Sequence, residues 1–189
     1  MRITDIILTV IDHNGQFTGR TLLQKAIFFL NEIVDLNISF RPHYYGPYSS
    51  DVAIALENLV NIGFLNETEE RFSAGWNVWG EVRRYTFELT NEGKEIMETI
   101  RKSPKYQNIK KILDKLGKFA VSKDYDKLSK AAKIYHIVKS KGEITKLGIK
   151  QEAKKLGWNL TKNEITDMSS FLEKLGLINF VQSKKSKTH

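Results

Sequence analysis

The sequence predicts a mainly α-helical protein with small β hairpins, an α+β chain with two winged-helix-like domains related by an internal duplication. Apolar residues recur with the helical period through most of the 189 residues, and shorter segments alternate as strands do. The same order of capped helices and short strands occurs twice. We therefore expect a first domain over residues 1–103, a linking helix and linker over 104–126, a second, lysine-rich domain over 127–182 and a disordered basic tail over 183–189.

The first domain begins with three expected helices. One apolar face predicts a helix over residues 3–13, which Asn14-Gly15 ends. A second helix keeps the apolar period over residues 22–34, and Thr18 can cap it. After the turn-forming residues 41–49, a third helix runs from a serine cap to Gly63.

Two strands and a further helix complete this domain. Alternating side chains predict a short strand near residues 64–68 and a longer one near 83–89. Thr90 caps the next helix, which continues to Arg101. Helix, short strand, two helices and a hairpin follow one another in the order of a winged helix.

The second half is expected to repeat this order. A polar helix near residues 106–119 precedes a helix over 127–141, and Gly142 ends the latter. Thr145 and Thr161 cap the two helices that follow. Residues 177–181 are then expected to form a strand.

Short matches between the halves support the duplication. Gly15-Gln16-Phe17-Thr18 matches Gly142-Glu143-Ile144-Thr145 at an offset of 127 residues. Leu56-Glu57-Asn58-Leu59 resembles Leu172-Glu173-Lys174-Leu175 at an offset of 116 residues, so the first copy has 11 additional residues between the two blocks. Such matches also arise by chance, because caps and apolar periods recur in any helical protein.

Charge is divided unevenly along the chain. Of the 30 Lys+Arg and 22 Asp+Glu that give a net charge of +8, residues 1–103 hold 10 and 14, and residues 104–189 hold 20 and 8. The two parts therefore have net charges of −4 and +12, and every cation of the second part is a lysine. Lysine binds phosphate as a point charge, which predicts salt-sensitive and weakly sequence-selective nucleic-acid binding. The alternative is a solubilising lysine surface.

Two segments of the first domain contain its most distinctive residues. A Leu-Gln-Lys helix followed by a Tyr-Gly-Pro-Tyr-Ser turn resembles the YwgA-like family of uncharacterised bacterial and archaeal proteins, and more distantly the Panacea-type antitoxin domains. The resemblance implies a winged-helix-like fold and a regulatory or antitoxin-like setting, and it transfers no catalytic residue. The segments are Arg20-Thr21-Leu22-Leu23-Gln24-Lys25-Ala26-Ile27-Phe28-Phe29-Leu30 and Phe40-Arg41-Pro42-His43-Tyr44-Tyr45-Gly46-Pro47-Tyr48-Ser49.

The charges of the third helix of each expected domain indicate whether that domain can bind DNA, because this helix enters the major groove in helix-turn-helix proteins. In the first domain it has Asp51, Glu57 and no Lys or Arg, so phosphates would repel it. In the second domain, lysines four residues apart share one face of the preceding helix. A solvated helix face is the alternative. The candidate nucleic-acid-binding residues are Lys146, Lys150, Lys154, Lys155, Lys162 and Asn163, with Arg83 and Arg84 after the wing tip.

Aromatic residues in the wing and in the turn predict a protein contact or a dimer interface, where such residues are enriched. The alternatives for the wing are a loop folded onto its own core and a platform for unpaired bases. In the turn, Arg41 and His43 are expected to be exposed, and Tyr45 and Tyr48 to pack the turn onto the core. The candidate partner-binding residues are Trp76, Trp79, His43, Tyr44 and Tyr48.

The residues that catalysis or cofactor binding requires do not occur in recognisable patterns. There is no Cys, and the four His lack the spacing of a metal site. Neither a Gly-rich phosphate loop nor a Gly-x-Ser-x-Gly elbow is present. No apolar run approaches the ~20 residues that a membrane span needs. We therefore expect a cytoplasmic protein that is not an enzyme, with no catalytic residue, metal, cofactor or membrane partner.

Two functional hypotheses follow. The first is a winged-helix DNA-binding protein, a transcriptional regulator, that binds DNA phosphates mainly through its lysine-rich second domain. The alternative is a protein-interaction module, antitoxin-like or adaptor, that uses the acidic third helix, the tyrosine turn and the Trp-containing wing of the first domain. The two hypotheses are compatible, because an antitoxin often binds both a partner and DNA.

Overall fold

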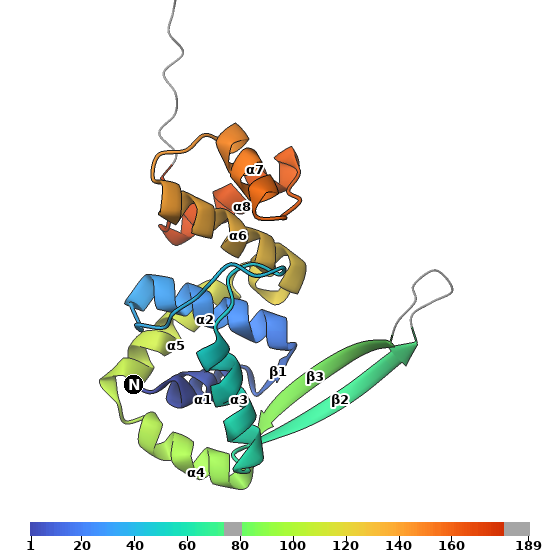
Figure 1. The fold of residues 1–189 in the computed structure, drawn as a ribbon. Coiled ribbons are helices and arrows are strands. Elements are labelled where there is room, and N and C mark those ends of the chain that lie inside the picture. Colours follow the sequence, from blue (N-terminus) through green and yellow to red (C-terminus); the bar gives the residue numbers. More distant parts are fainter. Residues whose placement is uncertain (74–80, 180–189) are drawn as a thin grey trace, which may run out of the picture.

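Three helices and a three-stranded antiparallel sheet form the N-terminal part of the computed structural model, which describes residues 1–73 and 81–179 (Figure 1). The strands lie in the order β1-β3-β2. This arrangement has the element order that the sequence predicts for the first domain. In chain order the elements are α1 (Ile3–Asn14), β1 (Gln16–Thr18), α2 (Arg20–Val34), α3 (Ser50–Asn61), β2 (Leu65–Ser73) and β3 (Glu81–Leu89).

The rest of the described chain is helical, so the prediction of a mainly α-helical protein with a small β part is confirmed. Figure 1 shows α6 between α2 and the pair formed by α7 and α8. The elements are α4 (Asn91–Ile100), α5 (Pro104–Gly117), the 3₁₀ helix η1 (Ala120–Lys123), α6 (Tyr125–Lys141), α7 (Lys146–Lys155) and α8 (Lys162–Leu175).

The expected strand over residues 177–181 is wrong for the part that the structure describes. Residues 177–179 are not in a strand, and residues 180 and 181 lie outside the described residues. The backbone N–H of Leu177 donates to Leu172 O and terminates α8, while Ile178 is buried in the core. The described residues therefore contain one hairpin, formed by β2 and β3.

One continuous core joins the two halves of the described chain. The Phe29 ring of α2 contacts Tyr135 of α6 and Phe171 of α8, with centroid distances of 6.5 and 6.1 Å. α5, expected as a polar linking helix, adds Ile109 and Leu113 to the same core. The division into two domains and the duplication remain predictions.

Side-chain caps begin four of the helices where the sequence predicts them. Ser49, Thr90, Thr145 and Thr161 each accept a hydrogen bond from a backbone N–H in the first turn of the helix that follows. Thr18 does not cap α2, because it belongs to β1 and its hydroxyl pairs with that of Thr86 on β3 at 3.1 Å.

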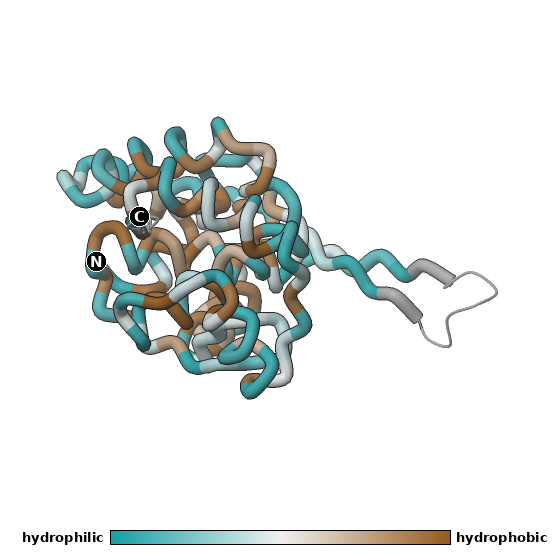
Figure 2. The backbone as a smooth tube through the Cα atoms, turned by 90° about the horizontal axis from the view of Figure 1, so that it is seen from above, coloured by the Kyte–Doolittle hydropathy of each residue, from teal (hydrophilic) through white to brown (hydrophobic). Residues whose placement is uncertain are grey.

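The β2–β3 hairpin extends away from the helices, and its described part is largely hydrophilic (Figure 2). Its two strands pair from Leu65 opposite Leu89 outward. Arg83 and Arg84 on β3 lie 3.9 and 4.0 Å from carboxylates of β2. Trp76 and Trp79 lie outside the described residues, as does the expected tail over residues 183–189.

Candidate functional site

Two neighbouring side chains of α2 fix the segment over residues 40–49, which we call the tyrosine turn. The side-chain amide of Gln24 donates to Ser49 O at 2.9 Å and accepts from Ser49 N at 3.1 Å. The ammonium of Lys25 donates to Pro47 O at 2.6 Å. The Gln and Lys of the Leu-Gln-Lys helix therefore anchor the backbone of the Gly-Pro-Tyr-Ser turn, which links the two motifs in the structure.

Gly46 lets this turn fit closely between α2 and α6. Its φ of +91° is a conformation that residues with a side chain rarely adopt. A Cβ at this position would lie 3.1 Å from Lys133 Cγ and 3.3 Å from Ser129 O, both on α6. Gly46 and Pro47 are buried, so the backbone of the turn forms part of the packing between the helices.

The second half of the chain reaches the tyrosine turn through Trp158, a residue that sequence reasoning missed. Its indole Nε1–H donates to His43 O at 2.8 Å, and its side chain is buried. The ammonium of Lys133 lies 5.6 Å from the Trp158 ring centre and 6.0 Å from that of Tyr44. The sequence signal for this contact is weak: it is a tryptophan that follows the glycine at the end of a helix.

Lys25 is the most unusual charged group of this region, because its side chain is 1% exposed. Burial lowers the pKa of Lys25 from its ordinary value of 10.5 to about 8, and the positive charge of Lys133 is the second cause. Burial also lowers the pKa of Lys133. A cavity of about 190 Å³ lies beside Lys25, and its walls include His43, Tyr45 and Glu57.

The three tyrosines of the turn are on the surface. Tyr44, Tyr45 and Tyr48 are 71%, 49% and 37% exposed, so the expectation that Tyr45 and Tyr48 pack onto the core is wrong. Gly46 and Pro47 between them are buried instead. Tyr44 packs edge-on against Tyr45 with centroids 4.9 Å apart, and the predicted exposure of Arg41 and His43 is confirmed.

The lysines predicted to bind nucleic acid gather on α7 and at the start of α8. Lys146, Lys150 and Lys154 are exposed along α7, and the ammonium of Lys146 lies 3.5 Å from Thr166 Oγ1 on α8. Lys162 and Asn163 are exposed in the first turn of α8. Across residues 1–73 and 81–179, these four lysines form no ion pair.

The other candidates of the set differ in their surroundings. Lys155 pairs with Glu152 at 2.6 Å, and Glu152 also pairs with Lys141 at 3.1 Å. Arg83 and Arg84 lie on β3, in a different part of the fold from α7 and α8 (Figure 1). The structure thus places Lys146, Lys150, Lys154, Lys162 and Asn163 on two helices that pack against each other and places the two arginines elsewhere.

The described part of the chain contains no cluster of three or more His, Asp or Glu side chains suited to a metal ion. Among its helices, none combines the length and apolar character that crossing a bilayer requires.

Comparison with known proteins gives one informative similarity. No protein-family model matches the chain. Over 93 residues the chain is 29% identical to the uncharacterised protein YwgA of Bacillus subtilis (strain 168), and the match covers 49% of this chain and 52% of YwgA. The chain thus spans about half the length of the curated relative it matches. The similarity supports the resemblance to YwgA-like proteins that the sequence motifs indicate.

Proposed function

We propose that this is a cytoplasmic DNA-binding protein, a transcriptional regulator of winged-helix type, that binds DNA phosphates through α7 and the start of α8. The observation that carries the proposal is the row of exposed, unpaired lysines described above, which begins beside Thr166 on α8. Lysines that form no ion pair with the protein's own carboxylates are available to phosphate oxygens, and their binding releases counterions from DNA.

The exposed charges of α7 and α8 differ in how well they suit contacts with DNA phosphates. α8 also exposes Asp167 and Glu173, which would repel phosphates, whereas the exposed charges of α7 at Lys146, Lys150 and Lys154 are all positive. We therefore assign the phosphate contacts mainly to α7. The first turn of α8, with Lys162 and Asn163, is the part of that helix best suited to approach the groove.

The third helix of the first half, α3, does not suit a contact with DNA. α3 exposes Asp51 and Glu57, so an approach to phosphates is unfavourable there. The DNA contact of the proposal accordingly lies in the second half. This assignment agrees with the charges of −4 and +12 of the two parts of the sequence.

A salt-dependent titration tests the proposal. Fluorescence anisotropy of a labelled DNA duplex is measured with the full chain at 50 and 200 mM salt. Three lysine–phosphate contacts predict an affinity loss of roughly 40-fold between the two salt concentrations. The triple variant Lys146→Gln, Lys150→Gln, Lys154→Gln should bind at least ten-fold more weakly at 50 mM salt.

A control triple variant has the same net charge. Lys102, Lys105 and Lys111 are exposed residues outside α7 and α8, and their change to Gln should leave the affinity within two-fold of the unmodified protein. Equal losses in both triple variants would mean that only the overall charge matters. Absence of binding at 50 mM salt would reject the proposal.

A second candidate function is a protein-interaction module, antitoxin-like or adaptor. It is favoured by the fixed, outward-facing tyrosine turn and by two exposed apolar side chains, Ile54 of α3 and Ile62 directly after that helix, at 56% and 61% exposure. Tyrosines supply large contact area at low entropic cost when their backbone is already held in place. A homodimer through this face is one form of the same hypothesis.

Sedimentation and partner capture distinguish this candidate from the first. A concentration-dependent increase in mass, or a captured protein identified by mass spectrometry, should disappear in the Tyr44→Ser, Tyr48→Ser double variant. It should persist in the control Tyr125→Ser, since the exposure of Tyr125, 59%, lies between those of Tyr44 and Tyr48 and the residue is outside the turn. Identical behaviour of the two variants would reject the assignment to the turn.

A further inference from the structure

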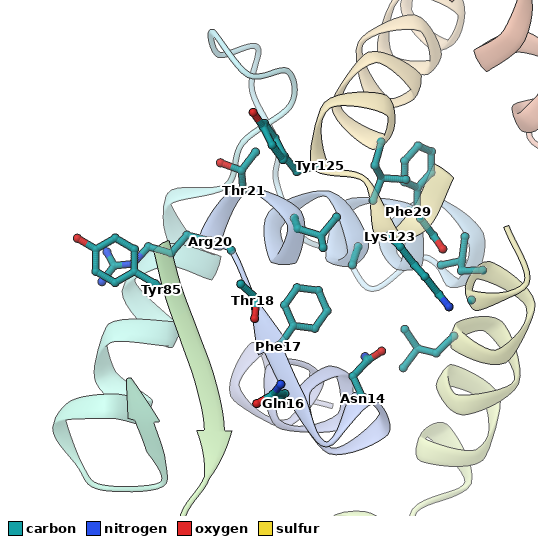
Figure 3. Close-up of a pocket in the computed structure, with 18 of the residues that line it drawn as sticks. Asn14, Gln16, Phe17, Thr18, Arg20, Thr21, Phe29, Tyr85, Lys123 and Tyr125 are labelled. Carbon is teal, nitrogen blue, oxygen red and sulfur yellow. The ribbon is translucent and has the colours of Figure 1, made fainter. Parts of the chain in front are cut away.

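A pocket of the described chain lies between the first-half sheet and the connection to the second half. Its volume is about 780 Å³, which is within the range of small-molecule sites. β1, β3 and the start of α2 form one side, and the end of α5, η1 and the start of α6 form the other. Figure 3 shows the Phe17 ring between these sides.

The charged side chains that line this pocket are all cations or histidine. Arg20, Arg83, Arg84 and Lys123 line it, and no Asp or Glu is among its described wall residues. Arg20, Arg83 and Arg84 each lie within 4.0 Å of a carboxylate of β2, and these carboxylates do not line the pocket. Figure 3 shows Arg20 beside Tyr85 on one side and Lys123 on the other.

The two cationic sides differ in how firmly they are held. Arg20 donates to Glu67 at 2.6 Å and lies 4.3 Å from the centre of the Tyr85 ring, so its guanidinium is fixed in place. Lys123 forms no ion pair within residues 1–73 and 81–179. A bound anion therefore gains a charge partner at Lys123 without breaking an ion pair of the described structure.

The floor between the charges is apolar. Phe17, Phe29, Leu113, Leu116 and Leu128 contribute to it, and they come from both halves of the chain. Burying the body of a ligand against such a floor contributes about 25 cal/mol for each Å² of apolar surface removed from water. Charge at the rim and apolar side chains on the floor together suit an amphipathic molecule.

One polar atom at this pocket has no partner. His13 lines the pocket, and its Nε2 contacts Asp114 Oδ1 at 2.8 Å. Its Nδ1 is buried and has no hydrogen-bond partner among the described residues. This nitrogen has almost no accessible surface, so the charges and the apolar floor, rather than His13, are the contacts for a ligand.

We propose that this pocket binds a small organic anion with an apolar body, such as an aromatic or short acyl carboxylate, sulfonate or phosphate ester. The anionic group lies at Lys123 and the apolar body on the floor around Phe17 and Leu116. Because the walls come from both halves, the bound anion stabilises their packing and acts as an effector. The site is separate from the lysines of α7 and α8.

The test uses two fluorescent probes of similar shape and different charge. 8-Anilinonaphthalene-1-sulfonate is an aromatic anion, and N-phenyl-1-naphthylamine is its neutral counterpart. The full chain should bind the anion saturably at one site. Lys123→Gln should weaken binding of the anion roughly three- to five-fold and change binding of the neutral probe less than two-fold. The control Lys118→Gln removes the same charge from an exposed residue that does not line the pocket.

A variant that fills the pocket tests whether the probes bind there or elsewhere on the protein. Gly117 lines the pocket, and a Cβ built there meets no atom within 4 Å, so Gly117→Phe can enter the pocket without a clash at its Cβ. It should weaken binding of both probes at least ten-fold with an unchanged circular dichroism spectrum. Lack of saturable binding, full binding to Gly117→Phe, or equal losses in Lys118→Gln and Lys123→Gln would each overturn the proposal. No DNA is used, so the result is independent of the DNA-binding proposal.

Discussion

Replacement of Lys25 by Met should abolish a rise in stability between pH 7 and 9. The ammonium of Lys25 is buried between α2, the tyrosine turn and α6, where it has one hydrogen-bond acceptor, Pro47 O, and a neighbouring positive charge, Lys133. Met keeps the length and the apolar stem of the side chain and removes the titrating group. The variant therefore changes the charge with little change in volume.

The lowered pKa of Lys25 determines both the size and the sign of the change in stability with pH. A drop from 10.5 to about 8 corresponds to about 3 kcal/mol of folding free energy lost when the buried amine is protonated. Between these two pKa values the unfolded chain binds more protons than the folded one, so stability rises as the pH increases. From pH 7 to 9 the gain from Lys25 is about 1.4 kcal/mol. Burial raises the pKa of Tyr135 to about 12, and the loss of stability from this group begins only near pH 10.

Urea unfolding at pH 7 and pH 9 measures this gain. The unmodified protein should gain about 1.4 kcal/mol more than Lys25→Met over this interval. At pH 7 the variant should be of nearly equal stability, because loss of the hydrogen bond to Pro47 O and removal of the buried charge oppose each other. Lys118→Met, at an exposed lysine, is the control and should follow the unmodified protein. Parallel curves for the unmodified protein and Lys25→Met would refute the reasoning.

Three further substitutions test the packing of the turn by urea unfolding at pH 7. Gly46→Ala should cost about 2 kcal/mol, because φ is +91° and the new Cβ would lie 3.1 Å from an α6 side chain. Gln24→Leu should cost about 1 to 3 kcal/mol, since it leaves the buried N–H of Ser49 without a partner, while Ser49 O keeps the hydrogen bond from Ala53 N. Gln151→Leu, at an exposed residue of α7, should change stability by less than about 0.5 kcal/mol. Trp158→Phe should cost about 1 kcal/mol through the lost hydrogen bond to His43 O. Costs below 0.5 kcal/mol in all three would contradict the anchoring of the turn.

Local sequence signals predict the starts of helices, because a helix start depends on residues within one turn. Apolar period and caps at Ser49, Thr90, Thr145 and Thr161 placed the starts of four helices, because capping depends on residues within one turn. The element order of the first half followed from the same signals. Thr18 was misassigned because a threonine before an apolar helix also suits a strand, and the partner that decides is Thr86 on β3.

The roles of Lys25 and the tyrosines depend on distant contacts and were not predictable from local patterns. Leu23, Gln24 and Lys25 are consecutive and all buried, since α2 is covered by the first-half core, the tyrosine turn and α6. A helix covered on several sides has no polar face to reveal its environment, and lysine is ordinarily exposed. Tyr45 and Tyr48 were expected inside because aromatic rings usually fill cores, yet the turn is buried through Gly46 and Pro47.

α6 is the element that contacts all three features on which the proposals depend. Its first turns, with Tyr125 and Leu128, line the pocket; Ser129 and Lys133 pack against the tyrosine turn; and its other side packs on α7 and α8. Any coupling between an anion in the pocket and DNA on α7 can therefore be transmitted through packing, by α6 or by the contact of Phe29 with Phe171 of α8, or through bulk charge. Linkage requires that the anion change DNA affinity by the same factor as DNA changes anion affinity. Because bulk charge is screened by salt and packing is not, a coupling factor that stays constant from 50 to 200 mM salt would assign the coupling to the packing between the pocket and the helices α7 and α8.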